Sequence, residues 1–420
     1  MPQLHQFTPT TPPSPATMQP ASTARHAAVG WAAFLWGLFV FFSISLNYVG
    51  LLGLLLTLAL DSNTWRARQK RLRTSPHWWP ALLFMGWFTV ILVTGAHYPE
   101  TASNAGHTFR IVLTLAAVVM LDRKEVLMAV RGFTASLILV LILIIMNHVV
   151  GLPDLALWHG ALQYTNNKSI ATAILLAVTA TSILILLPRM SAATTIISLI
   201  MLAVILFVLA VILHSRTAWM ILMAGILVGV VCSIRTKPKW TSLLAAVALA
   251  LIAAGVLTPS VRDHVTIGIS QVMKARQDPV HVSETSWGLR YIMYVETSRM
   301  IRRHPVTGNG IGSWNTIWRE RAPKNIRYLN MPHNDFLWMG MQAGIPGVFL
   351  FLAMIAASLP ARWRQRHADG GLGVMAMVGL LIAISLNSAL RDAAIGLPLW
   401  FVVLLWQRVS EQLEPQRPMR

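Results

Sequence analysis

Apolar segments about as long as a membrane span recur along this chain, and they constrain its fold more than any other feature. A helix needs roughly 20 apolar residues to cross the hydrocarbon layer. Charged residues make up only 12% of the chain, whereas soluble domains carry about 25%, so a water-facing surface of this size cannot be assembled. We therefore predict an all-α polytopic membrane protein. Its transmembrane helices number about twelve, near 27–45, 47–60, 78–94, 109–121, 125–147, 169–187, 191–213, 217–234, 240–258, 333–360, 372–387 and 394–407.

The basic residues separate the short loops into two sets. Alternate loops carry fourteen Lys and Arg, whereas the opposite ones hold only Lys168, Arg216 and Arg391, with Arg110 near one edge. Because Lys and Arg favour the cytoplasmic side in short loops, both termini are predicted to be cytoplasmic. We divide the chain into a disordered N-terminal tail (1–26), nine spans (27–258), an outward-facing loop with helices (259–332), three further spans (333–410) and a C-terminal tail (411–420).

The span at 333–360 contains Gly344, Pro346 and Gly347. A Gly just past one helix and a Pro at the start of the next mark a break. We therefore predict a short helix over 333–343 and a membrane helix from Pro346. Broken backbone at membrane depth has to line a cavity or be buried in protein.

The long outer loop is unusually basic, with eleven Lys and Arg against five Asp and Glu. Anionic lipid headgroups and an anionic substrate explain this charge equally well. Residues 289–303 contain no Gly or Pro and are predicted to be helical. The glycine-rich segment 308–313 lacks the spacing of a dinucleotide-binding loop. We interpret it as a tight turn that leads to Trp314 and Trp318, which we expect at the membrane interface.

Three ionisable residues at the outer membrane edge are the main candidates for chemistry, since charge near a bilayer is costly. His333 lies at a helix start, where the positive end of the helix dipole favours neutral imidazole, a possible general base. Arg216 lies between two apolar spans, and its planar fork suits phosphate oxygens. The alternatives are an interfacial histidine and a snorkelling arginine. Spacing alone does not separate Arg290 from the other arginines of its helix.

Other polar residues and the chain's overall charge give weaker indications. Lys168, which follows Asn166 and Asn167, is a candidate for anion or sugar binding, although ordinary cap chemistry explains these residues as well. The acidic residues form no cluster suited to a divalent metal, and the single cysteine, Cys232, excludes a Cys-rich site. We expect no metal and no cofactor. The net charge of +19 does not indicate nucleic-acid binding, because charge in a membrane protein has to be read by location.

Several short motifs, taken in order, resemble the bacterial O-antigen ligase family over about residues 30–410. They are Asn166-Asn167-Lys168, Ser215-Arg216 between two spans, Arg290 in the long loop, Gly310-x-Gly312, and His333-Asn334-x-x-Leu337 followed by Gly344 and Gly347. The resemblance implies a fold like that of the membrane-embedded type C glycosyltransferases. It also implies metal-independent transfer of a polysaccharide from undecaprenyl pyrophosphate to a sugar hydroxyl of lipid A–core oligosaccharide, on the periplasmic face of the inner membrane.

Carried over by position, His333, Arg216 and Arg290 match the essential residues of that family. His333 would accept the acceptor proton, and the two arginines would neutralise the departing pyrophosphate. We also expect Lys168, Asn167, Asn334, Asp335 and Arg110 to contact substrate. The same motifs occur in O-antigen polymerases and protein O-oligosaccharyltransferases, which stay open as alternatives. A lipid-linked oligosaccharide flippase is an alternative of another class, although a transporter needs access from both sides.

Overall fold

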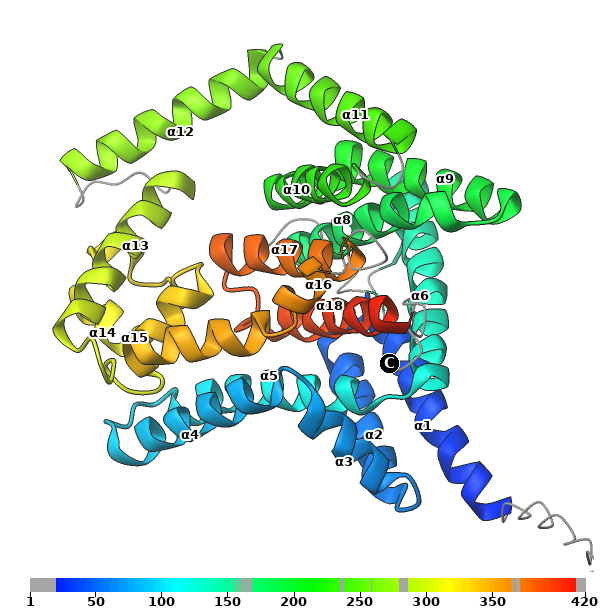
Figure 1. Ribbon diagram of the computed structural model, residues 1–420. Coiled ribbons are helices and arrows are strands. Elements are labelled where there is room, and N and C mark those ends of the chain that lie inside the picture. Colours follow the sequence, from blue (N-terminus) through cyan, green and yellow to red (C-terminus); the bar gives the residue numbers. More distant parts are fainter. Residues whose placement is uncertain are drawn as a thin grey trace, which may run out of the picture.

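The computed structural model describes residues 20–412 except 235–237, 258, 279–285, 365, 367–370 and most of 154–167, where only 155, 158 and 162 are described. Regular structure over these residues is helical. In chain order the α-helices are α1 (Pro20–Phe39), α2 (Ile44–Leu60), α3 (Trp65–Thr74), α4 (Trp78–Thr94), α5 (Thr101–Met120), α6 (Arg123–Val150), α8 (Lys168–Leu186), α9 (Ala192–Phe207), α10 (Arg216–Ser233), α11 (Pro238–Leu257), α12 (Pro259–Gln277), α13 (Ser286–Arg303), α14 (Ser313–Arg321), α15 (Asp335–Ala356), α16 (Leu359–Arg364), α17 (Gly371–Leu386) and α18 (Ala393–Gln412) (Figure 1).

The predicted all-α polytopic membrane architecture is confirmed. In the described part of the chain six helices are long and apolar enough to cross a membrane, or seven if the bent pair α2–α3 is one span. Every predicted span coincides with a helix. However, α4 and α17 have only 17 and 16 residues, and α5 carries polar residues through its first half. Helix α1 begins at Pro20, inside the segment predicted as a tail.

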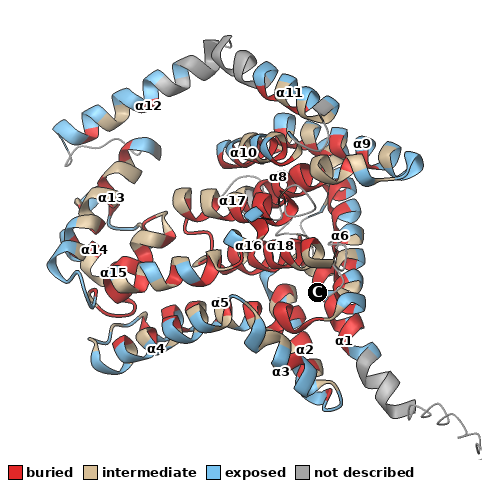
Figure 2. Cartoon of the chain, viewed as in Figure 1, coloured by how far each residue is buried: buried red, intermediate tan, exposed pale blue. Residues whose placement is uncertain are grey.

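The last helix, α18, lies at the centre of the bundle. Of its apolar window, 83% is buried, the largest fraction among the candidate spans. Helices α5, α8 and α17 pack around it, and Figure 2 shows that buried residues concentrate in α8, α17 and α18. Trp36 of α1 stacks on Phe401 with ring centroids 4.2 Å apart. A helix that is hydrophobic all round belongs in such a position.

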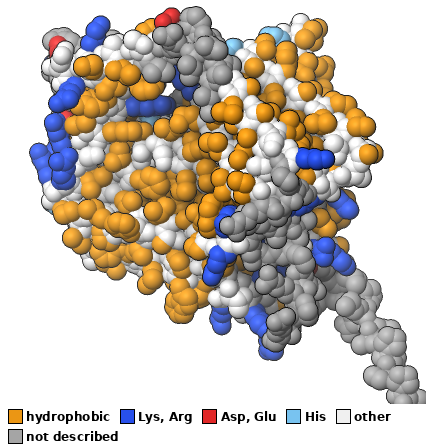
Figure 3. Space-filling model, turned by 45° about the horizontal axis from the view of Figure 1, so that its top comes forward, with side chains coloured by type: hydrophobic (Ala, Val, Ile, Leu, Met, Phe, Trp, Pro, Cys, Tyr) orange, Lys and Arg blue, Asp and Glu red, His pale blue; other side chains and the backbone are white. Residues whose placement is uncertain are grey.

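The outer surface of the bundle matches a lipid environment. Hydrophobic side chains are spread over much of the face in Figure 3, and the Lys and Arg side chains lie mainly along its left edge and in its lower part, with a few elsewhere. Large exposed apolar residues occur on several helices, for example Leu52 of α2, Val93 of α4 and Ile200 of α9. In water a continuous apolar surface of this kind would be a liability.

A buried ion cluster joins the ends of α2, α3 and α6. The Arg68 guanidinium lies 2.8 Å from the Asp61 carboxylate and 2.6 Å from the Glu125 carboxylate, and all three side chains are at most 2% exposed. Buried charges of this kind require pairing. The cluster fixes α3 at a bend of 118° from α2, so α3 does not continue that span.

Helices α12, α13 and α14 lie on the side of the molecule opposite the C-terminal end of α18 (Figure 1). Trp314 and Trp318 stack with centroids 5.0 Å apart and are 3% and 0% exposed. Their indole N–H groups donate to Thr297 Oγ1 (2.9 Å) and the Ile326 carbonyl (3.1 Å). The prediction that these tryptophans meet the membrane interface is therefore wrong: they form the core of this outer layer.

The predicted break in α15 is confirmed at Gly344, which has φ 69° and ψ −172°. The freed backbone groups find partners within the protein. The Ile345 N–H donates to the Pro305 carbonyl over 2.8 Å, and the Trp87 indole donates to the Ala343 carbonyl over 2.8 Å. The glycine-rich turn packs directly on the break, since a Cβ on Gly308 would lie 2.7 Å from the Gly344 nitrogen. Glycine is required here because two backbones approach so closely.

Candidate active site

His333 lies in the short loop before α15, in a strained backbone conformation. Its φ is 52°, a region that non-glycine residues enter only at a cost of roughly 1–2 kcal/mol. Two neighbours hold it in place. The Tyr294 hydroxyl donates to the His333 carbonyl over 3.0 Å, and Asn334 caps α15 by accepting from the N–H groups of Phe336 and Leu337. Strain that the surroundings maintain in this way clusters at functional sites.

Helix α13 brings Arg290 toward the same place. Arg290 precedes Tyr294 by four residues, so both lie on one face of the helix. Burial, and then the positive charges of Arg290 and Arg391, lower the pKa of His333 to about 4. The imidazole is therefore neutral at neutral pH and has a lone pair available to accept a proton.

Arg216 is the first residue of α10 and is exposed. Burial, and then the charge of Arg216, lower the pKa of Arg290, so the two guanidinium groups act on one another. His214, the residue two before Arg216 in the sequence, has φ 44°. His214 and His333 are the non-glycine residues with positive φ in the described chain.

The loop between α17 and α18 (residues 387–392) is hydrogen-bonded to both α15 and α10. The Asp335 carboxylate accepts from the N–H groups of Leu390 (2.7 Å) and Arg391 (3.2 Å). The Arg110 guanidinium donates to the carbonyls of the same two residues over 2.6 and 3.2 Å. Both side chains are buried. The Asn387 amide donates to Thr217 Oγ1, beside Arg216, over 3.2 Å.

This geometry gives three of the predicted substrate residues a positioning role. Asp335 and Arg110 hold the α17–α18 loop from both sides of its backbone, and Asn334 caps α15 while its amide donates to the Ser385 carbonyl over 2.9 Å. Direct contact of these residues with substrate stays a prediction. Asn167 and the side chain of Lys168 lie outside the described residues, so the same holds for them.

Arg391 is the residue that the sequence reasoning missed. It is one of the few basic residues in the loops that the sequence predicts to face outward, which was a usable signal, but nothing local connects it to His333, 58 positions earlier. Asp335 and Arg110 fix its backbone, and its charge contributes to the lowered pKa of His333. The site thus combines one neutral imidazole with three guanidinium groups from α10, α13 and the α17–α18 loop.

This arrangement suits one kind of chemistry. A neutral imidazole can take a proton from a hydroxyl, and arginines can stabilise negative charge that develops on phosphate oxygens. No group of three or more His, Cys, Asp or Glu side chains that could hold a metal ion occurs in the described part of the chain. Metal independence of the reaction stays a prediction.

Comparison with known families adds an independent finding. Residues 201–352 match the family model described as O-antigen ligase. The matched range runs from α9 into α15 and includes Arg216, Arg290 and His333, whereas Arg391 lies beyond it. A search of curated proteins found no significant match.

Proposed function

Since residues 201–352 match the family model described as O-antigen ligase, we propose that this protein is a membrane glycosyltransferase of lipopolysaccharide biosynthesis. It transfers a polysaccharide from undecaprenyl pyrophosphate to a sugar hydroxyl of lipid A–core oligosaccharide. We place its site on the periplasmic face of the bacterial inner membrane, with both termini in the cytoplasm. The loop-charge asymmetry supports this orientation.

The observation that carries the proposal is the neutral imidazole of His333 beside several guanidinium groups. In the proposed step the acceptor hydroxyl attacks the anomeric carbon of the donor sugar, and its proton passes to His333. The bond between that carbon and the pyrophosphate oxygen breaks, and undecaprenyl pyrophosphate leaves with the electron pair. Attack from the face opposite the leaving group would invert the anomeric centre.

The arginines have a distinct task in this step. Arg216, Arg290 and Arg391 stabilise the charge that grows on the leaving pyrophosphate, and one such preorganised group contributes roughly 3–4 kcal/mol. The bound donor in turn changes the pKa of His333. Its negative charge beside the imidazole raises the pKa of His333 from its value of about 4 in the free protein, because an opposite charge favours the protonated form. The pKa then moves toward the range where a general base is effective.

The nature of the product distinguishes this proposal from its alternatives. We would incubate the purified protein in detergent with undecaprenyl-pyrophosphate glycan and lipid A–core, in excess EDTA, and separate the products by mass. The proposal predicts a high-mass lipid A–core product. Lengthened lipid-linked chains with unchanged lipid A–core would indicate a polymerase, and a glycosylated protein acceptor in a parallel reaction would indicate an oligosaccharyltransferase. No covalent product from active donor would contradict the transferase assignment and favour a flippase.

A further inference from the structure

At the other end of α18 from Arg391, a cavity of about 190 Å³ opens between α3, the α3–α4 turn and the last turns of α18. Arg408 lies 15 residues after Ala393, the first residue of α18, which is about 22 Å along a helix at 1.5 Å per residue. This separation is most of the thickness of the hydrocarbon layer, roughly 30 Å. The cavity therefore lies near the opposite membrane surface from His333. Its lining residues are Arg71, Thr74, Ser75, Pro76, His77, Val119, Leu404, Gln407, Arg408 and Glu411.

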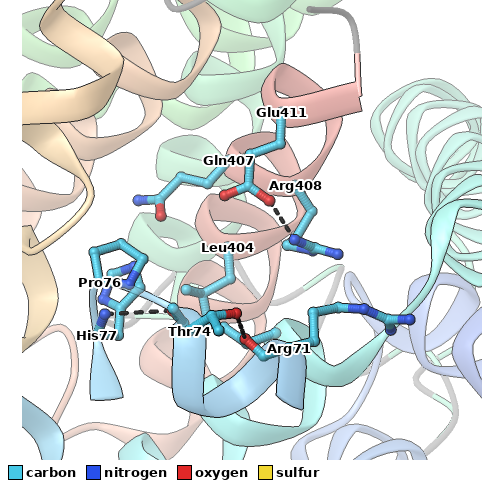
Figure 4. A pocket seen from close by; sticks show the side chains of 10 residues that line it. Arg71, Thr74, Pro76, His77, Leu404, Gln407, Arg408 and Glu411 are labelled. Carbon is cyan, nitrogen blue, oxygen red and sulfur yellow. Dashed lines mark hydrogen bonds and ion pairs between the residues drawn. The ribbon is translucent and has the colours of Figure 1, made fainter. Parts of the chain in front are cut away.

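Two arginines from different helices meet at this cavity. Figure 4 shows Arg71 of α3 and Arg408 of α18 on one side, with His77 and Gln407 on the other. Arg71 donates to the Met120 carbonyl, and Arg408 donates to the Leu121 carbonyl over 2.8 Å. Both interactions are with neutral groups at the C-terminal end of α5. The two guanidinium groups lie close enough for their positive charges to repel one another.

The acidic residue at the cavity does not cancel this charge. Glu411 bonds Arg408 and also lies 3.6 Å from Arg362, so one carboxylate is shared between two cations. Arg408 Nε is buried without a partner among the described residues. The Ser75 hydroxyl accepts from the His77 N–H over 3.3 Å and can still donate toward the cavity, whereas the Thr74 hydroxyl donates to the Lys70 carbonyl over 3.0 Å. The wall of the cavity therefore carries two guanidinium groups and the Ser75 hydroxyl against one shared carboxylate, and guanidinium groups are the donors that best suit phosphate oxygens.

The surroundings indicate that the phosphate comes from a lipid. Helix α3 turns away from α2 by 118° and leaves Trp65, Arg66, Lys70 and Arg73 exposed. Basic residues and tryptophan at the end of a span are typical of the headgroup level of a membrane. By liquid volume the cavity could hold about six waters at roughly 30 Å³ each, which is enough for a phosphodiester group and part of its glycerol.

We propose that this cavity binds the phosphate group of an anionic phospholipid in the cytoplasmic leaflet, with Arg71 and Arg408 as the cations that hold it. The bound headgroup would bridge α3 and α18 and relieve the repulsion between the two guanidinium groups. The loop that holds Arg391 leads directly into α18. A headgroup bound at the C-terminal end of α18 would therefore also stabilise the helix that begins at this loop.

The test is retention of lipid by the purified full chain in detergent, measured by native mass spectrometry. The probes are phosphatidylglycerol, phosphatidylcholine and inorganic phosphate. We expect the wild type to retain one phosphatidylglycerol in preference to phosphatidylcholine. Arg71→Gln and Arg408→Gln keep a donor for the α5 carbonyls but lose the charge, and each should weaken retention about fivefold, from roughly 1 kcal/mol per basic residue. Arg73→Gln, on the same helix but not in the cavity wall, is the control.

A second variant keeps the proposal falsifiable if the arginine variants fold poorly. Glu411→Gln removes the negative charge and should strengthen phosphatidylglycerol retention severalfold, a gain that misfolding cannot produce. Full competition by millimolar inorganic phosphate would assign the cavity to a free anion and overturn the lipid assignment. Equal retention of both phospholipids, or an equal loss in Arg73→Gln, would overturn the site itself.

Discussion

The break in α15 offers a sharp test of the account, because it sets the direction of the helix that follows His333. A Cβ added to Gly344 would lie 2.1 Å from the Val306 carbonyl oxygen and 2.8 Å from that of Pro305. These are backbone atoms, which cannot rotate away as a side chain would. Gly344→Ala therefore has to displace the turn that contains the Pro305 carbonyl, the acceptor for Ile345 N–H.

The magnitude follows from three contributions. A φ of 69° costs an alanine roughly 1–2 kcal/mol. Overpacking against rigid neighbours costs about 1–3 kcal/mol, and weakening of the Ile345–Pro305 hydrogen bond costs about 1 kcal/mol. We therefore expect Gly344→Ala to destabilise the protein by about 3 kcal/mol or more, and to reduce ligation because α15 carries the Asn334 cap and Asp335.

Gly53 provides the matched control. It lies within α2, and a Cβ built there meets nothing within 4 Å. Because alanine is the better helix former, Gly53→Ala should be neutral or stabilise by up to about 1 kcal/mol. The assay is thermal unfolding of both variants in the same detergent, with ligation measured alongside. A Gly344→Ala protein that unfolds at the wild-type temperature and ligates normally would refute the account of the break.

Three further perturbations test other parts of the structure. The pKa of His333 is about 4 in the fold and 6.5 ordinarily, so between these values only the unfolded chain binds the proton. The free energy of unfolding should thus fall as pH is lowered through this window. In His333→Asn the unfolding temperature should fall less between pH 6.5 and pH 4 than it does in the wild type, and an equal fall in both proteins would contradict the lowered pKa of His333. Asp335→Ala removes the acceptor of two buried backbone N–H groups, each of which costs about 1–3 kcal/mol when it is left unpaired, and should lower both thermal stability and ligation. Wild-type values of both would contradict its positioning role. Arg68→Met removes the cation between two buried carboxylates and should lower the free energy of unfolding of the protein by about 3–5 kcal/mol. An unchanged unfolding temperature in the same thermal assay would contradict this role of Arg68.

Local sequence patterns predicted much of the fold. Apolar runs located the helices, and the Gly344–Pro346 pattern located the break, because both features depend on residues close together in the chain. Over the described residues six helices, or seven with the bent pair, are long and apolar enough for a span. The predicted bounds 78–94 and 372–387 agree with α4 and α17 to within one residue, and both helices are a few residues shorter than a typical span. For α5 the apolar run located only the second half of the helix, because its first half is polar.

The site was only partly predictable. Arg216 and His333 were named as candidates from their positions, and Arg290 only from the family resemblance. The structure brings their segments together, while their roles stay predictions. The role of Asp335 was not accessible, since its partners are backbone N–H groups 55 and 56 positions away, which leave no pattern in the sequence. The buried positions of Trp314 and Trp318 escaped prediction for a related reason. The covering layer is built by α13 and α14 packing on α15, and tryptophan spacing alone also fits a membrane interface.

The central claim is that His333 accepts the acceptor proton, and the ligation rate of a His333→Asn variant tests it most directly. Asparagine tolerates positive φ better than alanine does, so the backbone conformation is preserved while the base is removed. His304→Asn, at an exposed histidine of the same outer layer, is the control. We predict a loss of about 100-fold or more for His333→Asn with retained thermal stability, and wild-type rates for His304→Asn. A stable His333→Asn protein that ligates at a rate near wild type would contradict the account.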